Sequence, residues 1–578
     1  MDNKKIAQVF EEMADMLEIS GESFFRVNAY RKGALTVENL GEDLRNVRKG
    51  GEKLIEEIPG IGKALAEKII ELVDTGKCVA YEKMRAGFPT GLLEILKVRG
   101  IGPKKVKLFY ENLAVDSVAK LKAAAEKGLI RELPKMGEKS EAEILTAIGE
   151  FEQFSGERVL VHIALYEAER LMGYLRGLPE LLKIEYAGSL RRRQESIGDI
   201  DILTTAKDPE KVRKKVMAYF VAYDEVLTVV AQGDTKSSVI LKSGIHCDLR
   251  LVEPVSFGAA LHYFTGSKDH NIVIRDLAKK QGLKVNEYGV FDGEKRVCGE
   301  NEEEIFGLFG LPWVPPELRK GDLEFEYGLK HGKFPRLIEE SDLRGDLHCH
   351  SLYSDGKRTI EEMAAAMMAK GYEYFAMTDH SKAMGITGGM DEEKIRRQWT
   401  EIDELNKKLA GKIRILKGCE VDILKDGDLD FGDEILKELD VVVASAHLHG
   451  RLPAEQQTKR LLKALENPYV KILGHPTGRL INKRAEMEFD MDAVVKAAVA
   501  NGVALEINAS PSRLDLPDKY LRRAKEMGAK FTIDTDSHDS DQIEFMQFGV
   551  GIARRGWLTK ADVVNTRALG ADLTLSFE

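Results

Sequence analysis

Short apolar runs alternate with longer amphipathic segments through residues 360–533. Each run is continuous and bounded by polar residues, which is the pattern of strands buried on both faces of a parallel sheet. The segments between the runs have helical spacing, at 360–370, 391–410, 455–466 and 491–501. The alternation predicts a β/α barrel with strands at 374–377, 413–416, 441–444, 470–473, 503–507 and 531–533.

Histidines and acidic residues directly follow these predicted strands, where a β/α barrel carries its chemistry. One catalytic zinc needs three protein ligands and an open position, so a larger set predicts two or three metals. Adjacent metals clamp the attacking and leaving oxygens of a phosphoester, which predicts a metal-dependent phosphoesterase. Isolated histidines are more often core or surface groups, an interpretation that covers His162, His331 and His449. The predicted ligands are His348, His350, Asp355, His380, Glu420, His447, His475, Asp536 and His538.

This pattern resembles the PHP (polymerase and histidinol phosphatase) domain over roughly residues 340–578. The matching motifs are 346–355, 378–380, 418–420, 445–447, 474–476 and 535–538. The resemblance implies a distorted seven-stranded β/α barrel that holds two or three Mn²⁺ or Zn²⁺ ions. It implies three ligand groups: His348, His350, Glu420 and Asp536; Asp355, His380 and His538; and Glu420, His447 and His475.

In the middle of the chain, a predicted strand leads to a basic turn and then to a second strand with two acidic positions. Period-2 alternation places Asp199 and Asp201 on one face of that strand. Two such carboxylates bridge a pair of Mg²⁺ or Mn²⁺ ions, and Asp248 on a later strand, 245–252, is placed to reach the same ions. An isolated Asp-x-Asp is more often a solvated strand edge, so the surrounding residues decide between the two interpretations.

Gly188-Ser189 and three arginines at 191–193 precede these carboxylates. This combination resembles the nucleotidyltransferase fold of family X DNA polymerases. The resemblance implies that Tyr263 and Phe264 pack against the incoming sugar. Asn271 and Arg275 share one helix face, and the resemblance implies that they contact the nascent base pair and the template. Leu190 and Arg193 depart from the commoner family pattern. The expected deoxynucleotide (dNTP) contacts are Gly188, Ser189, Arg191, Arg192, Gly198, Tyr263, Phe264, Gly266, Asn271 and Arg275.

Near the N-terminus, Gly60-Ile61-Gly62 and Gly100-Ile101-Gly102 each lie between two predicted helices. Glycine permits a tight turn and close approach of a phosphate, and a helix N-terminus adds free N–H groups. A single Gly-x-Gly is usually an ordinary connection, but two copies resemble helix–hairpin–helix motifs, which hold the DNA backbone. Lys104 and Lys105 are the expected phosphate contacts. A monovalent cation is a further candidate ligand of the hairpins.

Residues 25–32 resemble the small amino-terminal domain of DNA polymerase beta. In that domain a lysine forms a Schiff base with an abasic sugar, and Lys68 occupies the matching position. Such a lysine must be partly deprotonated. Glu67 and Glu71 flank Lys68, and a solvated surface lysine fits the sequence equally well. Lyase activity is therefore one of two open interpretations.

The chain has 578 residues, a net charge of −10 and five cysteines without a paired motif. Its length predicts three or more domains, and its cysteine usage predicts reduced thiols in a cytoplasmic protein. No apolar run reaches transmembrane length. We expect a monomer with no membrane partner. The expected ranges are 1–150 for the hairpin region, 151–319 for the nucleotidyltransferase, 320–340 for a linker and 341–578 for the PHP domain.

The order of these segments resembles bacterial and archaeal family X DNA polymerases with a C-terminal PHP domain. The expected fold is an all-α hairpin region, an α+β polymerase beta-like palm with a thumb or finger subdomain, and a distorted (β/α)7 barrel. The resemblance implies short-gap filling on gapped or primer-template DNA with dNTPs, 3′–5′ exonuclease activity and cleavage at abasic sites. Two alternatives stay open: a nucleotidyltransferase acting on RNA or a small molecule, fused to a histidinol-phosphatase-like phosphoesterase, and a DNA-binding scaffold with such a domain.

Overall fold

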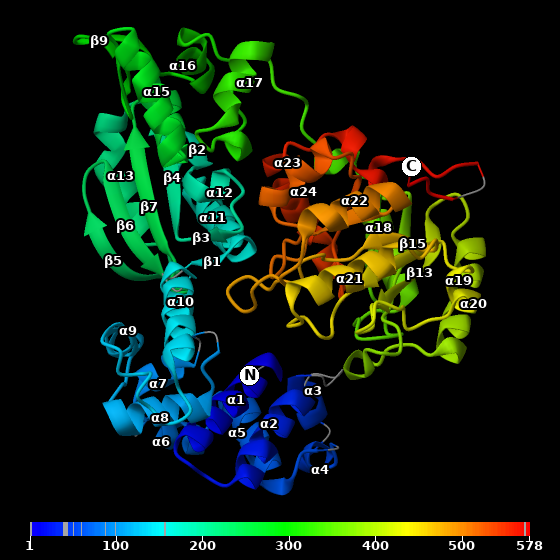
Figure 1. The fold of residues 1–578 in the computed structure, drawn as a ribbon. Coiled ribbons are helices and arrows are strands. Elements are labelled where there is room, and N and C mark those ends of the chain that lie inside the picture. The colour runs from blue at the N-terminus through cyan, green and yellow to red at the C-terminus, as the bar shows by residue number, and fades with distance from the viewer. Residues whose placement is uncertain are drawn as a thin grey trace. The chain divides into compact units, whose positions relative to one another are not determined.

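The computed structural model describes residues 3–38, 44–49, 51–58, 60–86, 88–96, 98, 100–154, 158–571 and 574–577. The chain divides into two compact units, Met1–Gly156 and Glu157–Glu578 (Figure 1). The described residues of the first unit are helical and those of the second carry four sheets. Across the described residues, no helix is both long and apolar enough to cross a membrane.

The first unit contains two hydrophobic cores. One gathers Phe10, Met13 and Ile69, and the other gathers Phe109 and Ile148. Its helices are α1 (Asn3–Ile19), α2 (Phe24–Glu38), α3 (Leu44–Lys49), α4 (Glu52–Glu56), α5 (Lys63–Thr75), α6 (Val79–Ala86), α7 (Thr90–Ile95), α8 (Pro103–Leu113), α9 (Val118–Glu126) and α10 (Glu138–Phe154).

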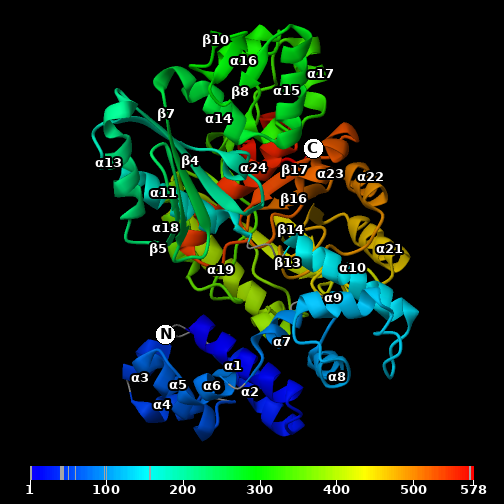
Figure 2. The same ribbon diagram turned by 90° about the vertical axis from the view of Figure 1, so that its left-hand side faces the viewer.

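The second unit contains a five-stranded sheet in the order β2-β4-β7-β6-β5 (Figure 1). Its neighbouring strands β4 and β7 also lie side by side in Figure 2. Strands β4 and β7 are parallel, and the other pairs are antiparallel. Ile200 and Ile202 are buried, whereas Asp199 is exposed and Asp201 is half-buried, as period-2 alternation predicts. The elements are β1 (Val159–Leu160), α11 (Val161–Leu175), β2 (Leu181–Tyr186), α12 (Gly188–Arg191), β3 (Ser196–Ile197), β4 (Asp199–Ala206), α13 (Pro209–Val221), β5 (Val226–Gln232), β6 (Lys236–Leu241) and β7 (His246–Val252).

A helical layer and a small sheet follow this palm-like sheet. Residues 284–298 contribute the three strands of a small antiparallel sheet in the order β10-β9-β8. The range 320–340, expected as a linker, contains helix α17 (Leu323–His331) with Phe325 buried. The other elements are α14 (Phe257–Thr265), α15 (Lys268–Lys280), β8 (Lys284–Asn286), β9 (Gly289–Asp292), β10 (Lys295–Cys298) and α16 (Glu302–Leu308).

The last part of the second unit is a nearly closed barrel of seven parallel strands in chain order. The predicted strands and helices are present, together with a short first strand that the hydrophobic pattern does not reveal. The segments directly after the first and last strands meet through backbone bonds, Asp536 N to His348 O at 2.9 Å and His350 N to Ser537 O at 2.8 Å. The strands are β11 (Gly345–Asp346), β12 (Tyr374–Met377), β13 (Arg414–Asp422), β14 (Val441–Ser445), β15 (Val470–Leu473), β16 (Ala504–Asn508) and β17 (Phe531–Asp534). The helices are α18 (Ile360–Lys370), α19 (Glu392–Lys408), α20 (Asp433–Leu436), α21 (Ala454–Leu465), α22 (Met491–Asn501), α23 (Asp518–Glu526) and α24 (Met546–Arg555).

Candidate metal centres

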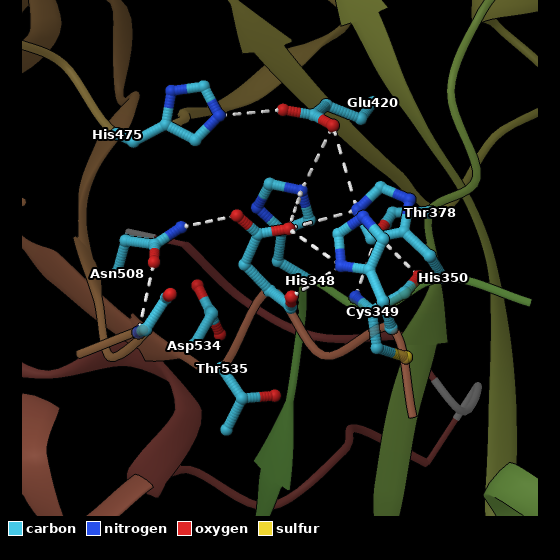
Figure 3. Close-up of polar contacts among 12 residues, drawn as sticks. His348, Cys349, His350, Thr378, Glu420, His475, Asn508, Asp534 and Thr535 are labelled. Carbon is cyan, nitrogen blue, oxygen red and sulfur yellow. Dashed lines mark hydrogen bonds and ion pairs between the residues drawn. The ribbon is translucent and has the colours of Figure 1, made fainter. Parts of the chain in front are cut away.

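The strand ends of the barrel bring eight of the nine predicted ligands together in three groups, and His475 belongs to none of these groups. Figure 3 shows His348, His350, Glu420 and His475 at these strand ends. Within each group, one ligand atom per residue lies within 4.8 Å of the others. His350 and His380 each belong to two groups, so the groups are adjacent. The groups are His350, Asp355, His380 and His538; His348, His350 and Asp536; and His380, Glu420 and His447.

Glu420, which is buried, belongs to the third group and also contacts His348 of the second. Its Oε1 is 2.9 Å from His475 Nε2 and 3.2 Å from His447 Nε2. Its Oε2 is 2.9 Å from His380 Nδ1 and 3.3 Å from His348 Nε2. The two oxygens thus face different histidines, which is the arrangement that a carboxylate shared by two ions requires.

The donor set fits metal ions, because several buried polar atoms are unsatisfied. His348 Nε2, His350 Nδ1 and Glu420 Oε2 have no hydrogen-bond partner among the described residues. Such atoms cost free energy when buried, and a coordinated cation satisfies them. Burial alone would raise the pKa of Glu420, but His447, His348 and His380 outweigh it and hold the pKa well below its usual range. Glu420 is therefore ionised, as a ligand must be.

The second candidate centre lies in the palm-like sheet. Asp201 on β4 pairs in register with Asp248 on the neighbouring parallel strand β7. Asp248 also accepts a hydrogen bond from Ser238 Oγ at 2.6 Å and lies 2.7 Å from Lys236 Nζ. Burial, followed by the charges of Asp199 and Asp248, raises the pKa of Asp201 to about 6, with Arg250 opposing the rise. Carboxylates crowded in this way fit divalent cations.

A cavity of about 530 Å³ opens beside Asp199 and Asp201. Eight of the ten expected dNTP contacts line it: Gly188, Ser189, Arg192, Tyr263, Phe264, Gly266, Asn271 and Arg275. Gly188 has a φ of +62°, and a Cβ there would lie 2.9 Å from Asp201 Oδ2. Glycine therefore lets the turn pass close to the carboxylate.

Arg191 and Gly198 lie outside the lining of this cavity. Arg191 donates from both Nη atoms to Glu302, at 2.9 and 2.8 Å, and also to Thr265 Oγ1 at 2.7 Å. The guanidinium is thus engaged by a buried carboxylate, and the triphosphate contact expected of Arg191 stays a prediction. A Cβ at Gly198 would lie 3.3 Å from Arg158 Nη1, so Gly198 makes room for an arginine that does line the cavity.

In the first unit, both hairpin turns have the conformation that needs glycine. Gly60 and Gly100 have φ values of +91° and +77°. Gly62 and Gly102 are the N-caps of α5 and α8, and no described heavy atom lies within 4 Å of a Cβ built on either. The two helix N-termini are therefore open within this unit.

The lysines predicted near the hairpins differ in their surroundings. Lys104 is exposed, whereas Lys105 Nζ donates to Gly100 O at 2.8 Å. Lys68 Nζ donates to Ala64 O at 2.9 Å and lies 5.9 Å from the centroid of the Tyr30 ring. The surroundings of Lys68 leave both interpretations of this residue open.

Four protein-family models match parts of the chain. The model described as DNA polymerase beta thumb matches residues 260–320, and the PHP domain matches 346–510. The helix-hairpin-helix domain matches residues 1–78, and a SAM-like helix-hairpin-helix tandem matches 92–150.

A protein of Bacillus subtilis named DNA polymerase/3′-5′ exonuclease PolX is 39% identical over 576 residues, covering 98% of each chain. This chain belongs to the PolX family. A probable phosphatase of Thermoanaerobacter is 32% identical over 232 residues, which cover 38% of this chain and 89% of the phosphatase. A structure of Leishmania infantum polymerase beta covers 40% of this chain and 99% of its own, at 20% identity and a TM-score of 0.27.

In this PolX chain, the residues that contact the barrel ligands, Glu506 and Asn508, were not predicted from the sequence. Glu506 Oε1 is 2.6 Å from His348 Nδ1, and Asn508 Nδ2 donates to Asp536 Oδ2 at 3.0 Å. Such partners fix the orientation and basicity of a ligand. Glu506 interrupts the otherwise apolar run 503–507, which is the one signal by which the sequence marks it. Arg158 and Lys268 line the palm cavity and carry no comparable signal.

Proposed function

We propose that this protein is a DNA polymerase that extends primers in gapped or primer-template DNA with dNTPs. The observation that carries the proposal is the pairing of Asp201 with Asp248 beside a cavity of about 530 Å³. The name of the Bacillus relative supports the same activity. Asp199, Asp201 and Asp248 are the proposed ligands of Mg²⁺ or Mn²⁺.

Divalent cations at these aspartates would neutralise charge on the triphosphate. Ser189 and Arg192 are placed to donate to its oxygens, since both line the cavity. Tyr263 and Phe264 form an apolar part of the wall for the sugar. Asn271 Nδ2 donates to Tyr263 O at 2.8 Å, so the base contact and the sugar contact hold each other in place.

We propose that the barrel is a 3′–5′ exonuclease that holds two or three Mn²⁺ or Zn²⁺ ions. The ions would supply charge stabilisation at the phosphodiester. Glu420, which contacts residues of two groups, would be shared by two ions, and Glu506 and Asn508 would orient His348 and Asp536. Cleavage at abasic sites and at blocked 3′ ends belongs to the same chemistry, because each breaks a phosphoester at a 3′ position.

The proposed DNA contacts are the open N-termini of α5 and α8, reached through Gly62 and Gly102, with Lys104 and Lys105 beside the second. Backbone amides and lysines bind phosphates of any sequence. A monovalent cation at these turns and a lyase role for Lys68 are lesser parts of the proposal.

The test measures primer extension and primer degradation side by side, on gapped DNA with Mn²⁺. Asp201→Ala should lose extension and keep degradation, and His348→Ala should do the reverse. Equal loss of both activities in both folded variants would contradict two separate sites. Hydrolysis of a free phosphomonoester in place of a 3′ DNA end would favour a phosphatase, the activity named for several barrel relatives.

A further inference from the structure

A partly buried ion pair joins the palm to the barrel within the second unit. Arg479, six residues after β15, donates from Nη2 to Glu195 Oε1 at 2.7 Å and from Nη1 to Glu195 Oε2 at 3.1 Å. The Arg479 side chain is 10% exposed and that of Glu195 is 24% exposed. Paired hydrogen bonds of this kind fix both position and orientation.

Arg479 is itself held on the barrel side. Its Nε donates to Arg513 O at 2.8 Å, and its Nη2 also donates to Leu514 O. Burial alone would lower the pKa of Arg479, but Glu195 outweighs it and raises the pKa. The Arg479 side chain is thus charged and held in place by the barrel, and it in turn fixes the position of Glu195.

A second arginine of the barrel holds the same turn of the palm. Arg555, the last residue of α24, donates to Arg192 O at 3.1 Å and to Asp518 Oδ2 at 2.8 Å. With its amide oxygen turned toward Arg555, Gln194 accepts a further bond at 2.9 Å. The turn from Arg192 to Glu195 therefore has hydrogen bonds to the barrel at three of its four residues.

This turn carries the cationic wall of the nucleotide cavity. Arg192 lines the cavity and donates to Thr265 O, which fixes its guanidinium beside Gly266. Arg158 also lines the cavity, and its Nε donates to Ser196 Oγ at 3.0 Å. On the barrel side, Asn482 Nδ2 donates to Arg158 O at 3.3 Å. Arg158 and Arg192, two of the three arginines that line the cavity, are therefore attached to backbone that the barrel supports.

We propose that Arg479 and Arg555 of the barrel are positioning residues for nucleotide binding by the palm. They touch no substrate. They act by holding the turn from Arg192 to Glu195 so that Arg158 and Arg192 face the triphosphate before it arrives. Such preorganisation lowers the ordering cost of binding. The inference rests on the proposed function, in which the cavity binds a dNTP.

The test is a double-mutant cycle on the full chain with Glu195→Ala, Arg479→Ala and the double variant. Each single change should raise the KM for dNTP about fivefold with kcat within twofold, and the double variant should be no worse than the poorer single one. Glu195→Gln, which keeps one acceptor, should lie between wild type and Glu195→Ala. Glu185→Ala is the control. It removes an exposed carboxylate from β2 of the palm-like sheet and should leave the KM for dNTP unchanged.

Exonuclease activity reports on folding, because Glu195 lies outside the barrel. Glu195→Ala should keep it, and that variant carries the test if Arg479→Ala fails to fold. A wild-type KM in Glu195→Ala, or effects that multiply in the double variant, would overturn the positioning role. Extension that survives in Asp201→Ala would instead overturn the assignment of the cavity.

Discussion

Asp201 and Asp248 lie directly opposite each other on the parallel strands β4 and β7. Adjacent parallel strands present opposed side chains to the same face, so the two carboxylates reach one space although 47 positions separate them along the chain (248 minus 201).

Asp248→Asn should therefore lower the kcat of nucleotide incorporation by about a hundredfold or more, because a shared ion loses an anionic ligand. Exonuclease activity should persist. Primer extension under saturating dNTP measures the effect. Asp224→Asn, an exposed position in the same sheet region, is the control. Incorporation at the wild-type rate would remove Asp248 from the metal site.

The partner of a barrel ligand gives the second prediction. Glu506→Gln should weaken metal binding by about tenfold to a hundredfold, because His348 loses the carboxylate that orients it. Calorimetric titration with Mn²⁺ and measured metal content would show the loss, and polymerisation should be unaffected. Glu466→Gln, exposed after α21, should bind metal like wild type. Unchanged affinity in Glu506→Gln would mean that His348 is oriented by other contacts.

The hairpins offer a matched comparison of glycines. Gly62→Leu and Gly102→Leu should each weaken binding to DNA of any sequence by about tenfold, since a side chain there blocks phosphate approach without meeting the protein. Gly137→Leu is the comparison, because Gly137 lies directly before α10 and is equally open, but Lys135 stands where the hairpin motifs have their first glycine. Fluorescence anisotropy across a salt series measures affinity. If Gly137→Leu weakens binding as much as the other two, the hairpins have no special role.

A buried network behind the nucleotide cavity gives a pH-dependent prediction. Burial alone would raise the pKa of Glu302, but Arg319 and Arg191 outweigh it and hold the pKa well below its usual range. A depressed folded-state pKa stabilises the protein above the unfolded pKa of about 4.3, and that stability is lost as the pH falls below it.

Glu302→Gln should therefore lower the free energy of unfolding by about 3 kcal/mol at neutral pH, because the buried Arg319 and the half-buried Arg191 lose their partner. The difference from wild type should shrink as the pH falls below about 4. Urea denaturation at several pH values measures it. Glu303→Gln, exposed on the same helix, should change stability by less than about 0.5 kcal/mol. A pH-independent difference would show that lost packing, rather than charge, is responsible.

The barrel was predictable from the sequence because most of the predicted ligands follow an apolar run and so mark where a strand ends. A run such as 441–444 is ambiguous alone, but His447 directly after it fixes the direction and the end of the strand. Strand β11 escaped because it has only two residues and its chemistry begins two residues later, at His348.

Contacts between distant residues were not predictable. Arg191 looked like a phosphate ligand because it follows Gly-Ser, and only the fold brings Glu302 to it from 111 positions away. Arg158 reaches the cavity through β1 and β3, a pairing too short to leave a periodic signal. Side-chain partners of this kind depend on tertiary packing, whereas strand and hairpin positions depend on local pattern.

The barrel closes where the segments that follow β11 and β17 meet, and we call this contact the seam. Two backbone bonds, Asp536 N to His348 O and His350 N to Ser537 O, close it, and proposed metal ligands stand on both sides. Transient opening should start at this seam, and bound ions should act as a clasp across it. Amide exchange at 347–350 and 535–538 should then slow on metal loading, while exchange in β4 and β7 stays the same. Metal supply would thus set the lifetime of the closed barrel as well as its chemistry.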